Sequence, residues 1–450
     1  MGQGAGLGRA GGGAPLHHGG DRARARLTVG PTRPAGTTPA GAGESAPAAG
    51  GWAAFAHRDF ALYAAARFVS AVAVQVQNVA VGWLVYDLTG DPLALGLVGL
   101  AAFLPAVVLA LFTGHVADRF DRRSILVACY ALATLTAGGL LLCVWIGTRQ
   151  VWPIYLLVMG FGVGRAFANP AAQALVPNLV PLRHFQNAVA WNSSIWQTAT
   201  ITGPAVGGIL YAFGGSVVFG AATLMFALAL VLFGAIRPRS ATAARAGMSW
   251  ARLIAGFVFI RSRPVILGAI SLDMFAVLLG GATALLPIYA RDILAVGPTG
   301  FGLLRSMPAV GALLVALLLA RRPLARHTGR RMLQAVALFG LATIGFGLST
   351  SLVLSLFCLF VMGAADMVSV FVRQTLVQID TPDAMRGRVA AVNTVFIGAS
   401  NELGEFESGV VAAVIGTVPA VVVGGVGTLL VAALWSRWFP ALRDRDRLYG

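Results

Sequence analysis

The chain has 450 residues, of which 57% are hydrophobic and only 11% charged, whereas a soluble globular domain has roughly 25% charged residues. This composition excludes an ordinary soluble protein and predicts a polytopic membrane protein. The net charge of +16 would suit a nucleic-acid-binding protein, but the 33 basic residues, all arginine, gather in the N-terminal tail, alternate loops and C-terminal tail. This is the pattern of cytoplasmic loops, so we expect no nucleic-acid partner.

Residues 1–58 are rich in Gly, Ala, Pro and Arg and predict a disordered cytoplasmic tail. Twelve apolar segments follow, each long enough to cross a hydrocarbon core of roughly 30 Å at about 1.5 Å per residue. They cover approximately 60–86, 93–116, 124–147, 151–176, 184–212, 216–236, 264–290, 298–320, 330–350, 352–377, 386–413 and 416–438. Because backbone groups in lipid must be bonded within the segment, each segment should be a helix.

The segments divide into two sets of six, at residues 59–236 and 264–438, joined by a cytoplasmic linker at 237–263 and followed by a cytoplasmic tail at 439–450. A shift of 201 residues superposes the two halves with several identities, including Pro181 on Pro382 and Asn192 on Asn393. The sequence therefore predicts an all-α membrane protein with twelve transmembrane helices in two pseudo-symmetric six-helix bundles. The arginine-rich loops place both termini in the cytoplasm.

A charged loop at residues 114–123 separates the second and third segments and reads G-x-x-x-D-R-x-D-R-R. This pattern resembles the loop between helices 2 and 3 of the major facilitator superfamily of secondary transporters. The resemblance implies a conformational switch, in which the acid and the arginines bridge helix ends when the cytoplasmic side is closed. Its residues here are Gly114, Asp118, Arg119, Asp121, Arg122 and Arg123. We expect Asp118 to meet backbone amides of a facing helix, or Arg386 or Arg388; a topology anchor is the alternative.

Further motifs narrow the resemblance. Residues 86–90 (Y-D-L-T-G) and 381–388 (T-P-D-A-M-R-G-R) are similar to the enterobactin-exporter-like and macrolide-efflux-like branch of the superfamily, and Asp121 stands where the superfamily usually has glycine. The fifth segment contains Gly203, Pro204, Gly207 and Gly208, which match the end of the superfamily's antiporter motif. This match favours export, although a simple packing kink would leave the same sequence.

Ionisable residues inside the segments are costly unless they are paired or face water. The candidates for substrate or proton binding are Arg67, Arg165, Asp273, Asp366, Arg373, Glu402, Glu405 and Glu407. Arg165 and Asp366 are equivalent in the repeat, so we expect them to face each other and to couple transport to a proton or a charged substrate; a static pair, or an arginine capped by helix carbonyls, is the alternative. Glu402 and Glu405 share a helix face, whereas Glu407 points elsewhere.

Polar and aromatic residues in the first and fifth segments predict a cavity for a bulky amphipathic ligand, or else interfaces between helices. They are Gln75, Asn78, Trp191, Asn192 and Trp196. We predict a monomeric exporter of a small amphipathic molecule in the bacterial inner membrane, with lipid around it and the proton gradient as its energy source. We expect no cofactor, no metal and no enzyme activity. An importer or uniporter of the same fold is the alternative, with a membrane-embedded enzyme or a non-transporting sensor more distant.

Overall fold

The computed structural model describes residues 51–237, 250–322, 324 and 326–446, which fold into helices and short connections without a β-strand. The residues from Ala49 onward form one compact unit. The predicted tail at 1–58 therefore lies mostly outside the described residues, as does residue range 238–249 of the predicted linker.

The N-bundle, our name for the first six membrane helices, follows a short 3-10 turn, η1 (Ala53–Ala56). Its helices are α1 (Arg58–Thr89), α2 (Pro92–Arg119), α3 (Arg122–Trp145), α4 (Trp152–Leu179), α5 (Leu182–Ala212) and α6 (Gly215–Gly234). Gly90 ends α1 in the left-handed conformation, with φ of 61°, which glycine adopts without strain. The side chain of Asp91 then caps α2 by accepting a hydrogen bond of 2.9 Å from the amide of Leu93.

The C-bundle, our name for the second set of membrane helices, follows α7 (Trp250–Ser262), a helix within the predicted linker. Its first crossing, Pro264–Ile293, is broken into α8 (Pro264–Leu279), η2 (Ala282–Leu285), α9 (Leu286–Ile288) and a π-helical turn, η3 (Tyr289–Ile293). The other five are α10 (Gly297–Arg321), α11 (Thr328–Gly347), α12 (Leu352–Ile379), α13 (Asp383–Ile415) and α14 (Thr417–Trp438), and α15 (Pro440–Arg443) follows.

The break in the first crossing of the C-bundle lies where it presses against α13. A Cβ atom on Gly281 would lie 2.5 Å from the carbonyl oxygen of Gly404 and 2.6 Å from Oγ of Ser408. Only a residue without a side chain fits there.

Twelve crossings of the described chain, eleven of them single helices and one the broken segment from α8 to η3, have the lengths and order expected, with ends within a few residues of the predicted segments. Eight of these crossings pass a test of length and apolar composition alone. The other four, α4, α5, α11 and α13, are less apolar because they carry more polar side chains. In α4 and α13 the charged residues Arg165, Glu402 and Glu405 lie in mid-helix, where they can face a cavity instead of lipid.

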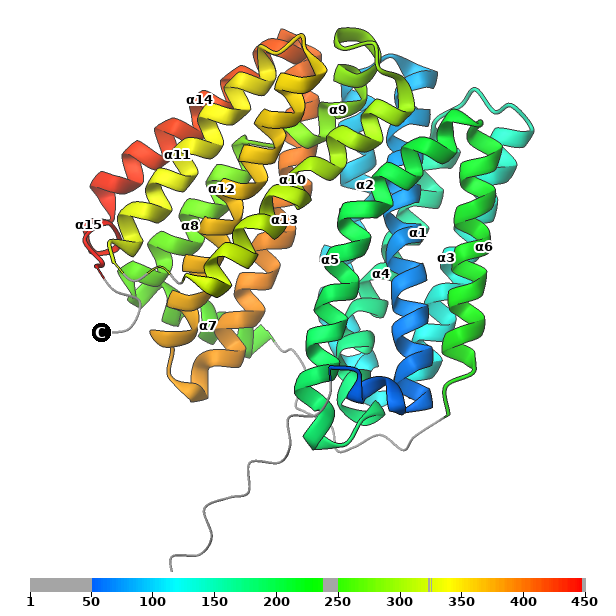
Figure 1. Ribbon diagram of the computed structural model, residues 1–450, viewed down its shortest axis with the longest axis horizontal. Coiled ribbons are helices and arrows are strands. Elements are labelled where there is room, and N and C mark those ends of the chain that lie inside the picture. The colour runs from blue at the N-terminus through cyan, green and yellow to red at the C-terminus, as the bar shows by residue number, and fades with distance from the viewer. Residues whose placement is uncertain (1–50, 238–249, 323, 325, 447–450) are drawn as a thin grey trace, which may run out of the picture. The chain divides into compact units, whose positions relative to one another are not determined.

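The packing of helices repeats between the two bundles (Figure 1). In the N-bundle α1 packs on α5 and α6, α2 on α4, and α3 on α4 and α6. The C-bundle repeats this arrangement with α8 on α13 and α14, α10 on α12, and α11 on α12 and α14. The bundles meet mainly where α5 packs on α10 and α2 packs on α13. Both of these contacts join the fifth helix of one bundle to the second of the other, as a pseudo-twofold axis requires.

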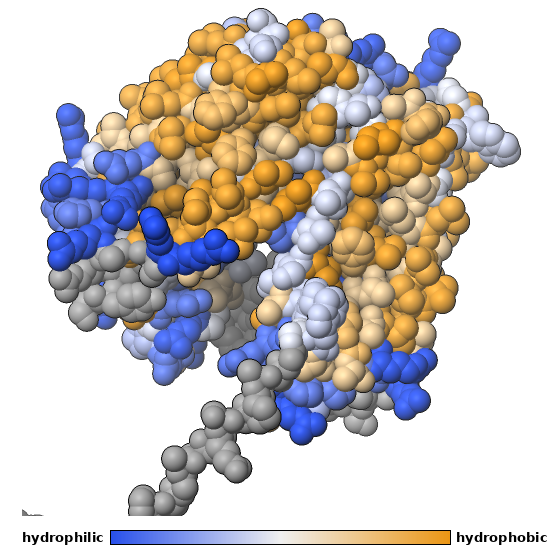
Figure 2. All heavy atoms as spheres, in the orientation of Figure 1, coloured by the Kyte–Doolittle hydropathy of each residue, from blue (hydrophilic) through white to orange (hydrophobic). Residues whose placement is uncertain are grey.

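Glycines bring the bundles into backbone contact. A Cβ atom on Gly208 of α5 would lie 2.5 Å from the carbonyl oxygen of Pro298 and 3.0 Å from the Cα atom of Gly302, at the start of α10. A Cβ atom on Gly409 of α13 would lie 2.7 Å from the Cα atom of Gly96 in α2. Figure 2 shows the surface hollowed between the two bundles on the side where α7 lies.

Candidate functional site

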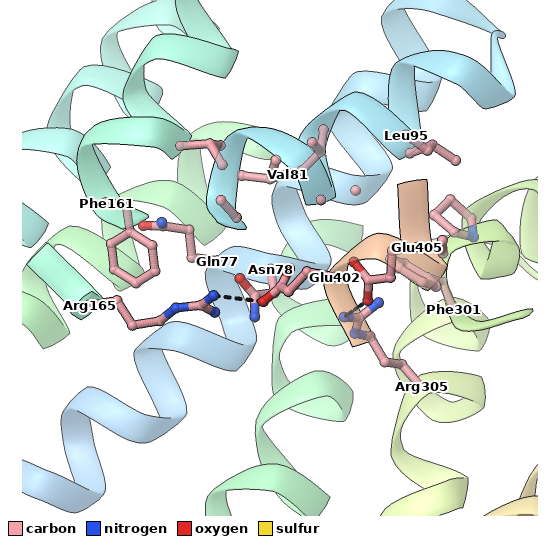
Figure 3. A pocket seen from close by; sticks show the side chains of 17 residues that line it. Gln77, Asn78, Val81, Leu95, Phe161, Arg165, Phe301, Arg305, Glu402 and Glu405 are labelled. Carbon is pink, nitrogen blue, oxygen red and sulfur yellow. Dashed lines mark hydrogen bonds and ion pairs between the residues drawn. The ribbon is translucent and has the colours of Figure 1, made fainter. Parts of the chain in front are cut away.

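A cavity of about 130 Å³ lies between the bundles, lined by residues of α1, α2 and α4 from one and of the first crossing, α10 and α13 from the other (Figure 3). The apolar side chains of its wall include Val81, Leu95, Phe161 and Phe301. The polar groups in the wall are Gln77, Asn78, Arg165, Arg305, Glu402 and Glu405. A cavity that combines apolar side chains with convergent polar groups suits a small molecule.

An ion pair joins the two bundles across this cavity. Nη2 of Arg165, on α4, donates a hydrogen bond of 2.7 Å to Oε1 of Glu402, on α13. Nη2 of Arg305, on α10, lies 3.9 Å from Oε1 of Glu405, one turn further along α13. Two arginines and two carboxylates therefore meet in one cavity, and their formal charges cancel.

The expected pairing of Arg165 with Asp366 is wrong, because Arg165 reaches Glu402 instead. Asp366 lies inside the C-bundle, where it lines a small separate cavity with Asp273 and Ser369. Ser369 Oγ donates to Asp273 Oδ1 at 3.4 Å. Asp273 and Asp366 thus belong to a polar cluster of the C-bundle, away from the central cavity.

Arg373 completes this C-bundle cluster. Its Nη2 lies 3.2 Å from Oδ2 of Asp273, and its Nη1 donates to Oδ1 of Asn393 at 2.7 Å. The arginine is almost completely buried, so the carboxylate of Asp273 provides the compensation that a buried charge needs. Glu407 is not among the residues that line the central cavity, in agreement with its different direction on α13.

The charged loop between α2 and α3 holds the N-bundle's own helices together. Asp121 caps α3 by accepting hydrogen bonds of 3.0 Å from the amide and the hydroxyl of Ser124. Arg122 donates to the carbonyl of Ala174 in α4 at 2.7 Å, and Arg123 donates to the terminal carbonyl of α6, at Gly234. These arginines therefore satisfy carbonyl groups near helix C-termini, where positive charge is favourable.

The remaining switch residues, Gly114, Asp118 and Arg119, lie in the last turns of α2, but their side chains are outside the described part of the chain. The bridging role of Asp118 thus stays a prediction. Arg386, one of its expected partners, forms an ion pair of 2.7 Å with Asp383 on its own helix, and Arg388 donates to the sulfur of Met385 at 3.6 Å.

Among the residues predicted to line the cavity or helix interfaces, Asn78 lines the cavity, Trp196 is exposed outside it, and the other three make helix contacts. The Cβ atom of Gln75 fills the space beside Gly203, where α1 crosses α5. Asn192 accepts a hydrogen bond of 3.1 Å from the hydroxyl of Tyr63. Trp191 packs against Trp52 and Phe55, with ring centroids 4.5 and 5.0 Å away. For Gln75, Trp191 and Asn192 the cavity interpretation is therefore wrong and the alternative of helix interfaces applies, because tight packing of α5 on α1 and η1 occupies those faces.

The motif glycines of α5 have two different roles. Gly203 and Gly207 face α1, where a Cβ atom on Gly207 would lie 3.0 Å from the Cα atom of Val76. Gly208 instead faces α10 of the other bundle. The motif therefore places α5 between its own bundle and the partner bundle at van der Waals distance.

A second set of contacts joins the bundles at the end of the molecule opposite α7 (Figure 1), and the sequence reasoning missed it. Nη1 of Arg291, a residue of the turn η3, lies 3.1 Å from Oδ1 of Asp87 at the end of α1. The guanidinium also lies 5.6 Å from the ring centroid of Tyr86, and the Tyr86 hydroxyl donates to Asp292. We call these four residues the outer latch. The available signal was Arg291 itself, an arginine between the seventh and eighth predicted segments and outside the arginine-rich loops.

Two pseudo-symmetric six-helix bundles that enclose a charged cavity define a secondary transporter of the major facilitator type. The comparison with protein families agrees. The chain belongs to the family described as "Transmembrane secretion effector", whose model matches residues 49–447. The protein is thus a multi-pass membrane transporter of the major facilitator superfamily and not an enzyme.

Relatives in the curated collection of proteins support the branch that the motifs indicated. The chain is 28% identical over 366 residues to the uncharacterized MFS-type transporter YfiS of Bacillus subtilis, covering 78% of this chain and 85% of YfiS. It is 26% identical over 385 residues to the enterobactin exporter EntS of Shigella boydii, covering 84% of this chain and 91% of EntS.

Solved structures share the fold. A bacterial homologue of the human lysosomal transporter Spinster, in an inward-facing and occupied conformation, superposes with a TM-score of 0.69 at 15% identity, covering 85% of this chain and 97% of that one. A bacterial homologue of the iron transporter ferroportin, in an inward-facing state, gives a TM-score of 0.64 at 17% identity, covering 85% of this chain and 98% of that one.

Proposed function

We propose that the protein exports a small amphipathic molecule, such as a drug, a siderophore or another secondary metabolite, by proton-coupled alternating access. In this proposal it works as a monomer in the bacterial inner membrane with both termini in the cytoplasm. The observation that carries the proposal is the Arg165–Glu402 ion pair, which joins α4 to α13 inside a cavity between the bundles. A bond of this kind responds to both a proton and a charged ligand.

The mechanism follows from the charges in the cavity. A proton on Glu402 removes the negative charge that holds Arg165, and the freed guanidinium then has to find water or an anionic group of the substrate. Release of the ion pair lets α4 and α13 move apart, and its reformation draws them together. Protonation, ligand binding and the relative position of the bundles are therefore linked through one contact.

Access to the cavity alternates between the two ends. The outer latch holds α1 against the C-bundle through Arg291 and Asp87, while the surface is hollowed on the side of α7 (Figure 2). The positive-inside rule assigns that hollowed side to the cytoplasm. Substrate would thus enter from the cytoplasm in this state and leave after the latch opens. The direction draws support from the antiporter-type glycines of α5 and from the similarity to an exporter of enterobactin.

The test is transport in everted membrane vesicles that contain the full chain. A panel of fluorescent amphipathic dyes is supplied outside, and a proton gradient is imposed with acid inside. We expect uptake of at least one dye, its loss on adding a protonophore, and its loss in Glu402→Gln. Glu407→Gln is the matched control, because it removes an acid from the same helix away from the cavity. Uptake that persists with the protonophore or in Glu402→Gln would refute proton coupling through this residue, and uptake only down a substrate gradient would favour a uniporter.

A further inference from the structure

Arg67 differs from the other arginines inside the membrane crossings. Arg165, Arg305 and Arg373 each lie within 4.0 Å of a carboxylate oxygen. Among the residues whose side chains are described, no carboxylate lies within that distance of Arg67, and its Nε atom, like that of Arg373, is buried without a hydrogen-bond partner. A charge inside a membrane protein that has no internal counter-ion is costly unless water or a ligand compensates it.

The group that faces Arg67 is an aromatic ring. Its guanidinium carbon lies 5.2 Å from the ring centroid of Trp196, on α5, and the indole is 44% exposed. The geometry is fixed one turn away by Tyr63, whose hydroxyl donates to Asn192 at 3.1 Å. Tyr63 precedes Arg67 by four residues, and Asn192 precedes Trp196 by four. The Tyr63–Asn192 and Arg67–Trp196 contacts therefore lie on the same faces of α1 and α5. The cation and the ring are thus positioned by the packing of α1 on α5.

The Arg67–Trp196 pair lies apart from the central cavity. Arg67 precedes Asn78 by eleven residues on α1, which places it about 16 Å closer to the α7 side at about 1.5 Å per residue. Exposed hydroxyl side chains continue along α5 on both sides of Trp196, at Ser193, Ser194, Thr198 and Thr202. Figure 2 shows a pale, more polar strip beside the hollow between the bundles. The hydroxyls of Ser194 and Thr202 donate to carbonyls of their own helix, and the strip borders the hollow on the α7 side.

We infer that Arg67 and Trp196 form a second binding site, which takes the aromatic anion of a substrate, such as an aromatic carboxylate, before it reaches the central cavity. The planar guanidinium offers two parallel N–H donors to a carboxylate, and the exposed indole offers a face to an aromatic ring. The central cavity has two positive and two negative groups and does not select a charge by itself. The uncompensated arginine on the approach therefore sets the preference. This inference rests on the proposed export function only for its biological role.

The phosphate of an anionic lipid has the same recognition chemistry for arginine as a soluble carboxylate. A lipid would have to enter the hollow to reach a residue nine positions into α1, and its headgroup provides no aromatic ring for Trp196. We therefore assign the site to the soluble aromatic anion and let the experiment distinguish the two sources.

The test is equilibrium dialysis of three labelled probes, 2-naphthoate, 2-naphthamide and 2-naphthylmethylammonium, against the full chain in phosphatidylcholine nanodiscs. We expect naphthoate to bind at least about tenfold more tightly than the amide, and the ammonium probe to bind most weakly. Arg67→Gln should weaken naphthoate binding by about 10–100-fold, the range for a charge-assisted hydrogen bond, with little effect on the amide. Trp196→Leu should weaken both. Equal binding of naphthoate and amide, or no effect of Arg67→Gln, would overturn the inference.

Matched controls remove an exposed arginine and an exposed tryptophan at the other end of the N-bundle, as Arg149→Gln and Trp145→Leu. Both should bind naphthoate as the unchanged chain does. Arg67→Lys keeps the charge but loses the two parallel donors, so it should retain only part of the affinity for naphthoate. This partial affinity shows whether the loss of binding in Arg67→Gln reflects misfolding. Loss of binding in the controls would also overturn the assignment.

Two further arms separate the remaining readings. Nanodiscs with added phosphatidylglycerol should leave naphthoate affinity nearly unchanged; an Arg67-dependent competition by this lipid would make a headgroup the occupant and overturn the inference. Dye transport in vesicles is measured in parallel. Naphthoate binding that depends on Arg67, without proton-driven transport, would refute the proposed exporter and leave the site intact. Proton-driven transport without any preference for the anionic probe would support the exporter and refute the site.

Discussion

The ion pair between Arg165 and Glu402 should contribute measurably to stability, because it is the bond that joins α4 to α13 within the cavity. Their side chains are 31% and 19% exposed. The perturbations are Arg165→Gln, Glu402→Gln and the two together. Each single change leaves the other charge without its partner in a partly buried position, whereas the double change removes both charges.

The expected magnitude lies between two known limits. Removing one member of a fully buried pair costs about 3–5 kcal/mol, whereas an exposed pair contributes about 0–1 kcal/mol. With partial exposure on both sides, we expect each single variant to lose about 1–3 kcal/mol. The double variant should lose less than the sum of the two, by a coupling energy of about 1–2 kcal/mol, since it leaves no charge unpaired.

The assay is unfolding of the purified chain in mixed micelles by titration with a denaturing detergent, followed by tryptophan fluorescence and circular dichroism. The same cycle with Arg165→Gln and Glu407→Gln is the control, and its effects should add within about 0.5 kcal/mol, because Glu407 does not line the cavity. If the Arg165 and Glu402 effects were equally additive, the ion pair would carry no free energy and the mechanistic role given to it here would be refuted.

Three further predictions test other parts of the molecule. Arg291→Ala removes the outer latch, whose exposed ion pair with Asp87 contributes about 0.2–1 kcal/mol. A cysteine introduced at Val81 should then react faster with a membrane-impermeant thiol reagent added from outside. An unchanged rate of reaction would contradict a latch. Gly208→Ala places a Cβ atom 2.5 Å from the carbonyl oxygen of Pro298 and should cost about 1–3 kcal/mol of stability in the titration with denaturing detergent. The control is Gly220→Ala, whose Cβ atom would meet nothing within 4 Å. This control should be neutral or stabilising. Asp121→Ala removes the cap of α3 and should lower the free energy of unfolding by about 0.5–2 kcal/mol. Asparagine is an equally good cap, so Asp121→Asn should lower it less. An equal loss in the two variants would argue against capping.

The sequence predicted the helices well because their signal is local. Each crossing needs a long apolar run with satisfied backbone groups, and turn residues such as Gly90, Pro181 and Pro382 mark the ends of these runs. The glycines of α5 were also found, but not their partners, since Gly208 touches α10 whereas Gly203 touches α1. Which face of a helix meets which neighbour depends on the rotation of that helix about its axis, and short motifs leave this rotation open.

The error over Arg165 and Asp366 has a specific geometric cause. Residues equivalent in a repeat are related by the pseudo-twofold axis, but they touch only if both lie close to that axis. The bundles instead meet through their second and fifth helices, so an arginine on α4 that points into the cavity meets α13.

The equivalent of Glu402 in the first half, 201 residues earlier, is Ile201, and α5 thus offers no charged group to Asp366. The acid lies instead with Asp273 and Ser369 in its own bundle, beside the ion pair of Asp273 with Arg373. The repeat is therefore symmetric in its backbone and asymmetric in its charges, and this asymmetry places both carboxylates of the central cavity on α13.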